Sequence, residues 1–438
     1  MKKLLSLIFI SLPYFANAQI ALDLKYCIER GLEKNYDIRI VKNTQQISDN
    51  NRSIGNAGFL PTLDLSAGYS GTLNNERNKL SDGGEIIEIN NINNQQLNAG
   101  VSLNWTVFDG FNVQTNYSRL KELQQVGELN TRLSIENFIA NISAEYYNYI
   151  QQTIRLKNLQ SSMELSRERM RIVEARYSIG SMSRLDLQQA KVDFNTDSSR
   201  LMRQQEVLFA SNIKLNQLMA FDNVEAPIVT ADSLIVFDML LNRADVWEEV
   251  TKGNTFLLLS EKDKRLSVID LKTAQSKNYP YLQINAGYGV NQNRSDLSDY
   301  AYRNTLGLNY GVTLGFNLFN GFNRSREQKN ARIMIENRAL EYEQLVLSLR
   351  SDFSNIWKAY QNNMELIILE QESVRNATEN YEIAMERYKL GNLSGIELRE
   401  AQNSLLNAEE RLLEAKYNTK LCEISLLLIS GQIKQYLN

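Results

Sequence analysis

The sequence predicts a mixed α+β membrane protein with long α-helical hairpins and four β-strands, which each chain contributes to a shared barrel. Three observations lead to this prediction. The 438-residue chain starts with an export signal, the mature part shows an internal two-fold duplication, and each repeat joins a pair of alternating strands to one very long helical stretch. A compact soluble globule has no room for helices of that length.

The chain begins with a predicted secretory signal peptide, residues 1–18. Two lysines precede an apolar run from Leu4 to Phe15, and Ala16-Asn17-Ala18 supplies the small residues of a cleavage point. The formal net charge of −3 argues against nucleic acid as a partner. Histidine is absent and only four prolines occur. The absence of histidine removes the commonest general base from the chain. The small number of prolines favours uninterrupted helices.

Three landmarks occur twice in the same order, which predicts two copies of one unit. RYSIGSMSRLDLQQA, from Arg176, aligns without a gap with RYKLGNLSGIELREA, from Arg387. FLPTLDLSAGYS resembles NYPYLQINAGYG, and LNWTVFDGFN resembles LGFNLFNGFN. The first and third pairs have the same separation along the chain, so positions in the two halves can be matched one to one.

The landmarks divide the chain into two repeats. Residues 19–219 hold a helix from Leu22 to Gly58, a β-hairpin at 61–108 and a helical hairpin at 111–219. Residues 244–431 hold a helix from Ala244 to Lys277, a β-hairpin at 280–318 and a helical hairpin at 322–431. Residues 220–243 are predicted to form a linker or equatorial segment, and residues 432–438 a C-terminal tail.

The predicted strands alternate apolar residues with polar or small ones. Leu63, Leu65, Ala67 and Tyr69 illustrate this period of two, and polar loops are expected at 71–96 and 291–304. Alternation alone also fits a half-buried hairpin in a soluble sheet. The export signal, the length of the runs and the aromatic residues near the strand ends favour lipid. Because four strands cannot close a barrel and about eight is the usual minimum, three copies giving twelve strands are the simplest solution.

Each strand pair leads into a long helix. Asp109 and Asn320 are predicted N-caps, and the helical pattern continues to Ser178 and to Lys389, a rod of roughly 100 Å. The returning helices, 184–219 and 395–430, are about half as long. We expect 184–219 to stack end to end with 244–277, and 395–430 with 22–58, so that the helices form a cylinder.

The motifs resemble those of the outer membrane efflux (TolC-like) family. VFDGF and LFNGF stand at the strand-to-helix junctions, RYSIG and RYKLG at the hairpin tips, and the likeness covers nearly all of the mature chain. The resemblance implies a homotrimer with a twelve-stranded barrel in the outer-membrane lipid and an α-helical tunnel across the periplasm. It further implies a passive exit duct for efflux or type I secretion, which needs no cofactor and docks to a periplasmic adaptor and an inner-membrane transporter.

The resemblance also implies that the tip residues meet the adaptor. The matching positions are Arg176, Tyr177, Gly180, Ser183, Arg387, Tyr388, Gly391 and Ser394. Local chemistry offers another interpretation. A helix that ends in a tight turn needs a left-handed glycine, and the helix that follows needs a capping serine, whatever the function. On this interpretation the arginines and tyrosines serve only to pack the tip.

Family members carry acidic residues just beyond the second tip that project into the closed pore. The matching residues are Glu397 and Glu400, and the first repeat has Asp186 and Gln189 there. A ring of carboxylates favours cations. Alternatively, these are ordinary acids of a first helical turn, which the helix dipole stabilises.

The two cysteines leave two interpretations open. Cys27 lies early in the first helix and Cys422 late in the last. Exported chains often pair their cysteines, and stacked chain ends would bring these two together. The other interpretation is two unpaired thiols on apolar helix faces.

No catalytic or metal-binding constellation stands out, so an enzyme is not predicted. The sequence has no Walker-type loop and no Cys/His cluster for zinc. The main alternative to an exit duct is a structural coiled-coil protein of the envelope that has no pore. The strand pairs argue against it, because a spacer needs none.

Overall fold

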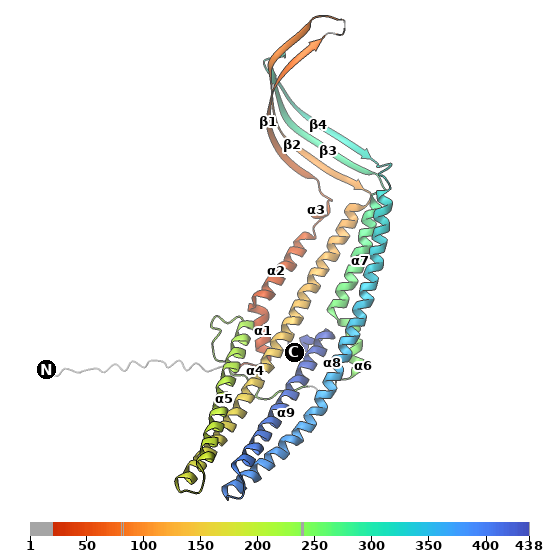
Figure 1. Ribbon diagram of the computed structural model, residues 1–438. Helices are drawn as coiled ribbons and strands as arrows, with labels where there is room; N and C mark the ends of the chain where they lie inside the picture. Colours follow the sequence, from red (N-terminus) through yellow and green to blue (C-terminus); the bar gives the residue numbers. More distant parts are fainter. Residues whose placement is uncertain (1–20, 80, 82, 238–240, 438) are drawn as a thin grey trace, which may run out of the picture. The chain divides into compact units, whose positions relative to one another are not determined.

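The computed structural model describes residues 21–79, 81, 83–237 and 241–437 (Figure 1). The predicted signal peptide lies outside the described residues. The chain divides into two compact units. The helical unit comprises Met1–Val41, Arg132–Thr255 and Leu347–Asn438, and the sheet unit comprises Lys42–Thr131 and Phe256–Val346.

The sheet unit contains one antiparallel sheet of four strands in the order β1-β2-β3-β4 (Figure 1). The strands are β1 (Thr62–Lys79), β2 (Ile86–Asp109), β3 (Tyr281–Ser295) and β4 (Arg303–Gly315). The loop expected at 71–96 is wrong, because β1 and β2 stay paired from Thr62↔Asn104 out to Lys79↔Ile86. Backbone pairing thus continues through an Asn-rich sequence of low strand propensity. The second returning strand was expected to reach residue 318 but ends at Gly315.

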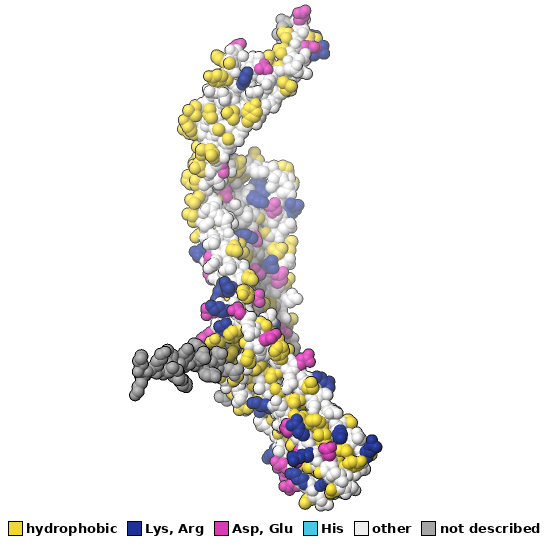
Figure 2. Space-filling view, turned by 90° about the vertical axis from the view of Figure 1, so that its left-hand side faces the viewer, with side chains coloured by type: hydrophobic (Ala, Val, Ile, Leu, Met, Phe, Trp, Pro, Cys, Tyr) yellow, Lys and Arg dark blue, Asp and Glu magenta, His cyan; other side chains and the backbone are white. Residues whose placement is uncertain are grey.

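One face of the sheet is apolar from edge to edge. Leu65 pairs with Val101, Val101 with Tyr288 and Tyr288 with Leu308, and all four side chains are exposed. The neighbouring register on the other face runs through Ser66, Gly100, Gly289 and Gly307. Figure 2 shows apolar side chains gathered along the sheet. The predicted alternation is therefore present, with its apolar face uncovered in the single chain.

Two left-handed residues in a row carry the chain from each sheet hairpin into a long helix. Gly110 and Phe111 have φ of 70° and 68°, and Gly321 and Phe322 repeat this with 68° and 60°. The carboxylate of Asp109 accepts a hydrogen bond from the Val113 amide at 3.1 Å. This residue caps the helix as predicted, although it lies three residues before the first helical residue, Asn112.

We expect Gly110→Ala to lower the free energy of unfolding by about 3 kcal/mol, from left-handed strain and overpacking together. A Cβ at residue 110 would clash with the Ser276 carbonyl oxygen. Gly83→Ala is the control, because Gly83 also has positive φ but a Cβ there meets nothing within 4 Å; about 1 kcal/mol is expected. Guanidinium unfolding followed by circular dichroism measures both, and equal losses would contradict the close approach.

The long helical hairpins are present as predicted. The outgoing helices α4 (Asn112–Ser178) and α8 (Asn323–Lys389) have 67 residues each. The returning helices α5 (Arg184–Leu218) and α9 (Gly395–Ile429) have 35 residues each. Because the helices have equal lengths in the two halves, the turn of each hairpin lies the same number of residues after the start of its outgoing helix.

The two leading helices are broken where single helices were expected. The first divides into α1 (Leu24–Lys34), α2 (Tyr36–Asn51) and α3 (Ile54–Ala57), and the second into α6 (Arg243–Gly253) and α7 (Thr255–Ser276). Asn35 leaves the helical conformation with ψ of 132°, and its side-chain oxygen accepts the Asp37 amide at 2.9 Å. Asn254 likewise leaves it, with ψ of 120°.

The same asparagines show that the expected stacking partners were wrong. The Asn35 amide donates to the Leu218 carbonyl at 3.1 Å, at the end of α5. The Asn254 amide donates to the Ile429 carbonyl at 2.8 Å, at the end of α9. Each returning helix therefore ends against the leading helices of its own repeat, because a buried amide satisfies carbonyls that the helix end leaves without partners.

The main core of the helical unit includes residues of α1, of the equatorial segment and of the C-terminal stretch around Ile433. The backbone of Leu22 bonds to Val229 and Ala231 at 2.8 and 2.9 Å, and the Tyr149 hydroxyl donates to the Ile228 carbonyl at 2.7 Å. The 3-10 helix η1 (Ile433–Leu437) closes the C-terminal end. The expected linker thus packs on α4, although its residues 238–240 lie outside the described chain.

Candidate functional site at the helical turns

The turns that join α4 to α5 and α8 to α9 have the same geometry. Gly180 and Gly391 are left-handed, with φ of 79° and 82°. The Ser181 amide donates to the Arg176 carbonyl and the Asn392 amide to the Arg387 carbonyl, both at 2.9 Å. These bonds satisfy carbonyls at the helix ends. The predicted role of the two glycines in stopping the helix is confirmed.

Each returning helix starts with a reciprocal capping box. Ser183 and Ser394 are the N-caps, and the side chains of Asp186 and Glu397 bond back to them. The Glu397 carboxylate accepts from the Ser394 amide at 3.0 Å and from its hydroxyl at 2.8 Å. The hydrogen bond from the backbone amide, then that from the hydroxyl, lowers the pKa of Glu397. Both predicted acids therefore serve as helix caps, whereas Glu400 is exposed on the next turn.

The two Arg-Tyr pairs are not equivalent within one chain. Arg176 donates to the carbonyls of Tyr388 and Lys389 at 3.3 and 2.8 Å, and its guanidinium lies 5.5 Å from the Tyr388 ring centre. Tyr388 is 0% exposed, and burial raises its pKa. Its assignment as a surface residue for an adaptor is therefore wrong, because it packs the tip. Tyr177 is 41% exposed.

A buried ion-pair network links the two hairpins near the turns. Asp197 of α5 is 2% exposed and accepts two hydrogen bonds from the Arg399 guanidinium of α9, at 2.5 and 2.7 Å. Ser166 of α4 also donates to this carboxylate, and Gln402 donates to Ser166 at 3.0 Å. A second ion pair joins Arg169 of α4 to Asp193 of α5. The network ties α4, α5 and α9 together.

The predicted sites did not include this network, although the sequence carries a signal for it. Asp197 continues a series of buried α5 positions spaced by seven residues. The series is Ala190, Asp197, Gln204, Ser211 and Leu218. A charged residue in a heptad series indicates a buried partner, but the sequence does not say on which helix that partner lies.

Two opposing effects act on the pKa of Asp197. Burial by itself would raise the pKa of this carboxyl, but the hydrogen bonds from Arg399 and Ser166 outweigh it, so the pKa is lowered. The ion pair is therefore formed at neutral pH.

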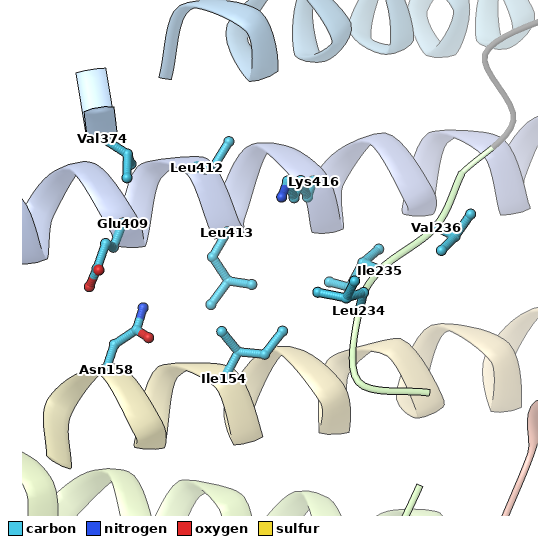
Figure 3. Close-up of a pocket in the computed structure, with 10 residues that line it drawn as sticks. All are labelled: Ile154, Asn158, Leu234, Ile235, Val236, Val374, Glu409, Leu412, Leu413 and Lys416. Atoms are coloured by element: carbon cyan, nitrogen blue, oxygen red, sulfur yellow. The ribbon is translucent and has the colours of Figure 1, made fainter. Parts of the chain in front are cut away.

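A small cavity of about 260 Å³ lies between α4, α9 and the equatorial segment (Figure 3). Ile154 and Leu413 point toward one another across it, and Glu409 and Asn158 face each other at one end. Burial raises the pKa of Glu409. The ionisable side chains among its described lining residues are Glu409 and Lys416.

Both cysteines are free thiols. Cys27 belongs to the main core of the helical unit, with Tyr146 and Leu215 among its members. Cys422 packs in a separate cluster beside Trp357, and the Asn363 amide lies 3.9 Å from its sulfur. Of the two interpretations left open by the sequence, the structure agrees with two unpaired thiols and not with a disulfide.

The described residues contain no group of three or more acidic or cysteine side chains that could hold a metal ion. Among the helices of the described chain, none combines the length and apolarity needed to cross a membrane.

Comparison with known proteins identifies the family. The sequence profile of the outer membrane efflux proteins matches residues 27–220 and 264–432. The chain belongs to the outer membrane efflux protein family. It is 20% identical to the outer membrane protein TolC of Escherichia coli K12, over 99% of this chain and 87% of TolC. It is 22% identical to the cation efflux system protein CusC of the same strain, over 67% of this chain and 64% of CusC.

Solved structures of outer membrane channels share the fold. The Campylobacter jejuni CmeC channel superposes with a TM-score of 0.76 at 16% identity, covering 93% of this chain and 85% of CmeC. The open state of the Neisseria gonorrhoeae MtrE channel superposes with a TM-score of 0.73 at 15% identity, covering 95% of this chain and 90% of MtrE. The family places this efflux protein in the outer membrane and accounts for the four-stranded sheet joined to long helices.

We expect Asp197→Asn to lower the free energy of unfolding by about 3 kcal/mol, because it leaves the Arg399 charge buried without its partner. Glu168→Gln is the matched control, because Glu168 forms a surface ion pair with Arg171 at 3.8 Å. Such a surface pair stabilises the fold by only about 0–1 kcal/mol. Denaturant unfolding gives the values, and limited proteolysis locates the loosened region at the turns. Similar losses in both variants would contradict a special role for the buried pair.

The lowered pKa of Asp197 predicts a specific pH dependence. The pair stabilises the fold fully above the unfolded-state pKa of an aspartate, about 3.9, and this contribution is lost as the pH falls through the folded-state value. The free energy of unfolding, measured from neutral to acidic pH, should fall by the contribution of this ion pair. The Asp197→Asn variant should lack that part of the fall. An unchanged pH profile in that variant would show that the ion pair contributes nothing.

Proposed function

We propose that the chain is one subunit of a homotrimeric exit duct of a tripartite efflux or type I secretion system. Three sheets join into a twelve-stranded barrel in the outer membrane, and the helical hairpins form a tunnel in the periplasm. No catalytic step is assigned to the protein. Energy comes from an inner-membrane transporter, and a periplasmic adaptor docks at the turns.

The sheet is the observation that carries this proposal. It ends in two edge strands, β1 and β4, and exposes a continuous apolar face. Lipid tolerates such a face but no open strand edge. Further copies of the same sheet, joined edge to edge, supply the missing strand partners. A spacer protein without a pore has no use for this surface.

The turns support the proposed adaptor contact with fewer residues than the family resemblance implied. Arg387 and Tyr177 are exposed at the tip, and Leu390 and Ile179, one residue before each turn glycine, are exposed as well. An adaptor would meet this exposed set. Gly180, Gly391, Ser183 and Ser394 shape the two turns that present it.

The proposed gate consists of Glu397, Glu400 and Asp186, repeated by three subunits around the narrow end of the tunnel. Like carboxylates in a ring attract cations and hold them there. Because Glu397 and Asp186 also cap helices, Glu400 is the position where charge can be removed without changing a cap.

Reconstitution of the full chain in planar bilayers tests the duct. Small cation-selective currents are expected, together with a trimer in detergent whose β-structure resists heating. Glu400→Gln should lower the cation preference and raise the current several-fold, because cations are no longer held at the tip. Glu414→Gln, an exposed glutamate farther along α9, is the control and should change neither. A monomer without conductance would favour a spacer protein instead.

A further inference from the structure

A second cavity of the helical unit, of about 460 Å³, lies between α4, α5 and α9, and three arginines line it. Arg155 belongs to α4, and Arg200 and Arg203 belong to α5. Glu410 of α9 is the one acid among the described lining residues, so three positive charges face one negative charge. Each of the three helices also adds a buried side chain to the lining, namely Leu159, Gln204 and Leu406.

The three guanidinium groups keep donors that the chain does not use. In the part of the chain that the structure describes, the Nε of Arg155 is buried and has no hydrogen-bond partner. Arg203 donates from its Nε to a backbone carbonyl at the long distance of 3.4 Å. Arg200 lies 3.7 Å from Asp197, a carboxylate that Arg399 already holds through two hydrogen bonds. Because a buried donor without an acceptor costs stability, the cavity favours an anion.

The second half of the chain shows the same position with its charge balanced. Arg411 of α9 matches Arg200 of α5 in the alignment of the two halves, and it binds Glu370 of α8 at 2.9 Å. In the first half, Leu159 stands at the position that matches Glu370. Arg200 therefore lacks the carboxylate on the neighbouring helix that its counterpart has.

Two further positions differ in the same direction. Arg155 is matched by Leu366 in the second half. Arg203 is matched by Glu414. Because the duplicated helices would otherwise carry similar side chains at these positions, the positive cluster is a property of the first hairpin alone.

We infer that this cavity, the arginine pocket, binds the phosphate group of a small phosphate ester through Arg155, Arg200 and Arg203. A phosphate monoester carries a charge of about −1.5 to −2 at neutral pH and three acceptor oxygens. Guanidinium groups bind such oxygens through paired hydrogen bonds. The volume is that of a small-molecule site, and Asn407 and Glu410 of α9 are left to contact the organic part of the ester.

The arginine pocket is a site apart from the proposed duct. All of its lining residues come from one chain, so the inference requires neither the trimer nor the adaptor.

Titration calorimetry of the full chain in detergent tests the pocket, with glycerol 3-phosphate and inorganic phosphate as probes and chloride keeping the ionic strength constant. One saturable site per chain is expected for glycerol 3-phosphate. Arg155→Gln and Arg203→Gln should each weaken its binding by about tenfold or more, because each removes charged hydrogen bonds. Arg171→Gln is the matched control, since Arg171 is an exposed arginine of α4 outside the pocket, and it should leave the affinity unchanged.

Leu159→Glu gives an independent check, because it places in the first hairpin the carboxylate that Glu370 supplies in the second. This variant should no longer bind glycerol 3-phosphate, since its own carboxylate occupies the arginines. Leu159→Gln, which has the same shape without the charge, should still bind. Without ligand, thermal unfolding should have a higher midpoint in Leu159→Glu than in Leu159→Gln, and glycerol 3-phosphate should raise the midpoint of the unsubstituted protein.

Three results would overturn the inference. The first is the absence of saturable binding of either probe. The second is equal weakening by Arg171→Gln and the pocket variants, which would show that the probes respond only to the overall charge. The third is inorganic phosphate binding as tightly as glycerol 3-phosphate, because an ester that also contacts α9 should bind more tightly than the free ion.

Discussion

The apolar face of the four-stranded sheet is the constraint on which the rest of the structure depends. Leu65, Val101, Tyr288 and Leu308 form one row across all four strands and have no cover in the chain. Exposure of such a surface to water costs roughly 25 cal/mol for each Å². In lipid, the unpaired backbone groups of the two edge strands have no hydrogen-bond partners. The proposed trimer in the outer membrane is a solution to both problems.

Both junctions between sheet and helix have the same unusual backbone conformation. The chain leaves each hairpin through a Gly-Phe pair in the left-handed region, a conformation that phenylalanine adopts at a cost. The rings of Phe108 and Phe111 meet edge to face at 5.1 Å, and those of Phe319 and Phe322 at 5.3 Å. Aromatic packing offsets part of the strain, and it does so in the same way in both halves.

The turns at the other end of the long helices are alike in backbone but differ in surroundings. Both have a left-handed glycine and a capping box. Yet Tyr388 is buried under Arg176, while Tyr177 remains exposed. Duplicated sequence therefore makes the same turn twice, and the position of each turn in the chain decides which one has a partner. The buried Asp197–Arg399 pair adds a second difference, because it holds the two hairpins of one chain together.

Features that depend on neighbours along the chain could be predicted from the sequence. These are the alternating strands, the long helices, the left-handed glycines and the serine caps, because periodicity, turn chemistry and capping act over a few residues. The other features depend on contacts between distant parts of the chain. Asn35 and Asn254 break their helices in order to bond to Leu218 and Ile429, Asp197 selects an arginine on a different hairpin, and the cysteines lie in separate clusters. The two asparagines and Asp197 each satisfy a buried polar group with a partner far along the chain, and the cysteines pack among residues from distant segments. Periodicity, turn chemistry and capping do not specify which distant residue a side chain will meet.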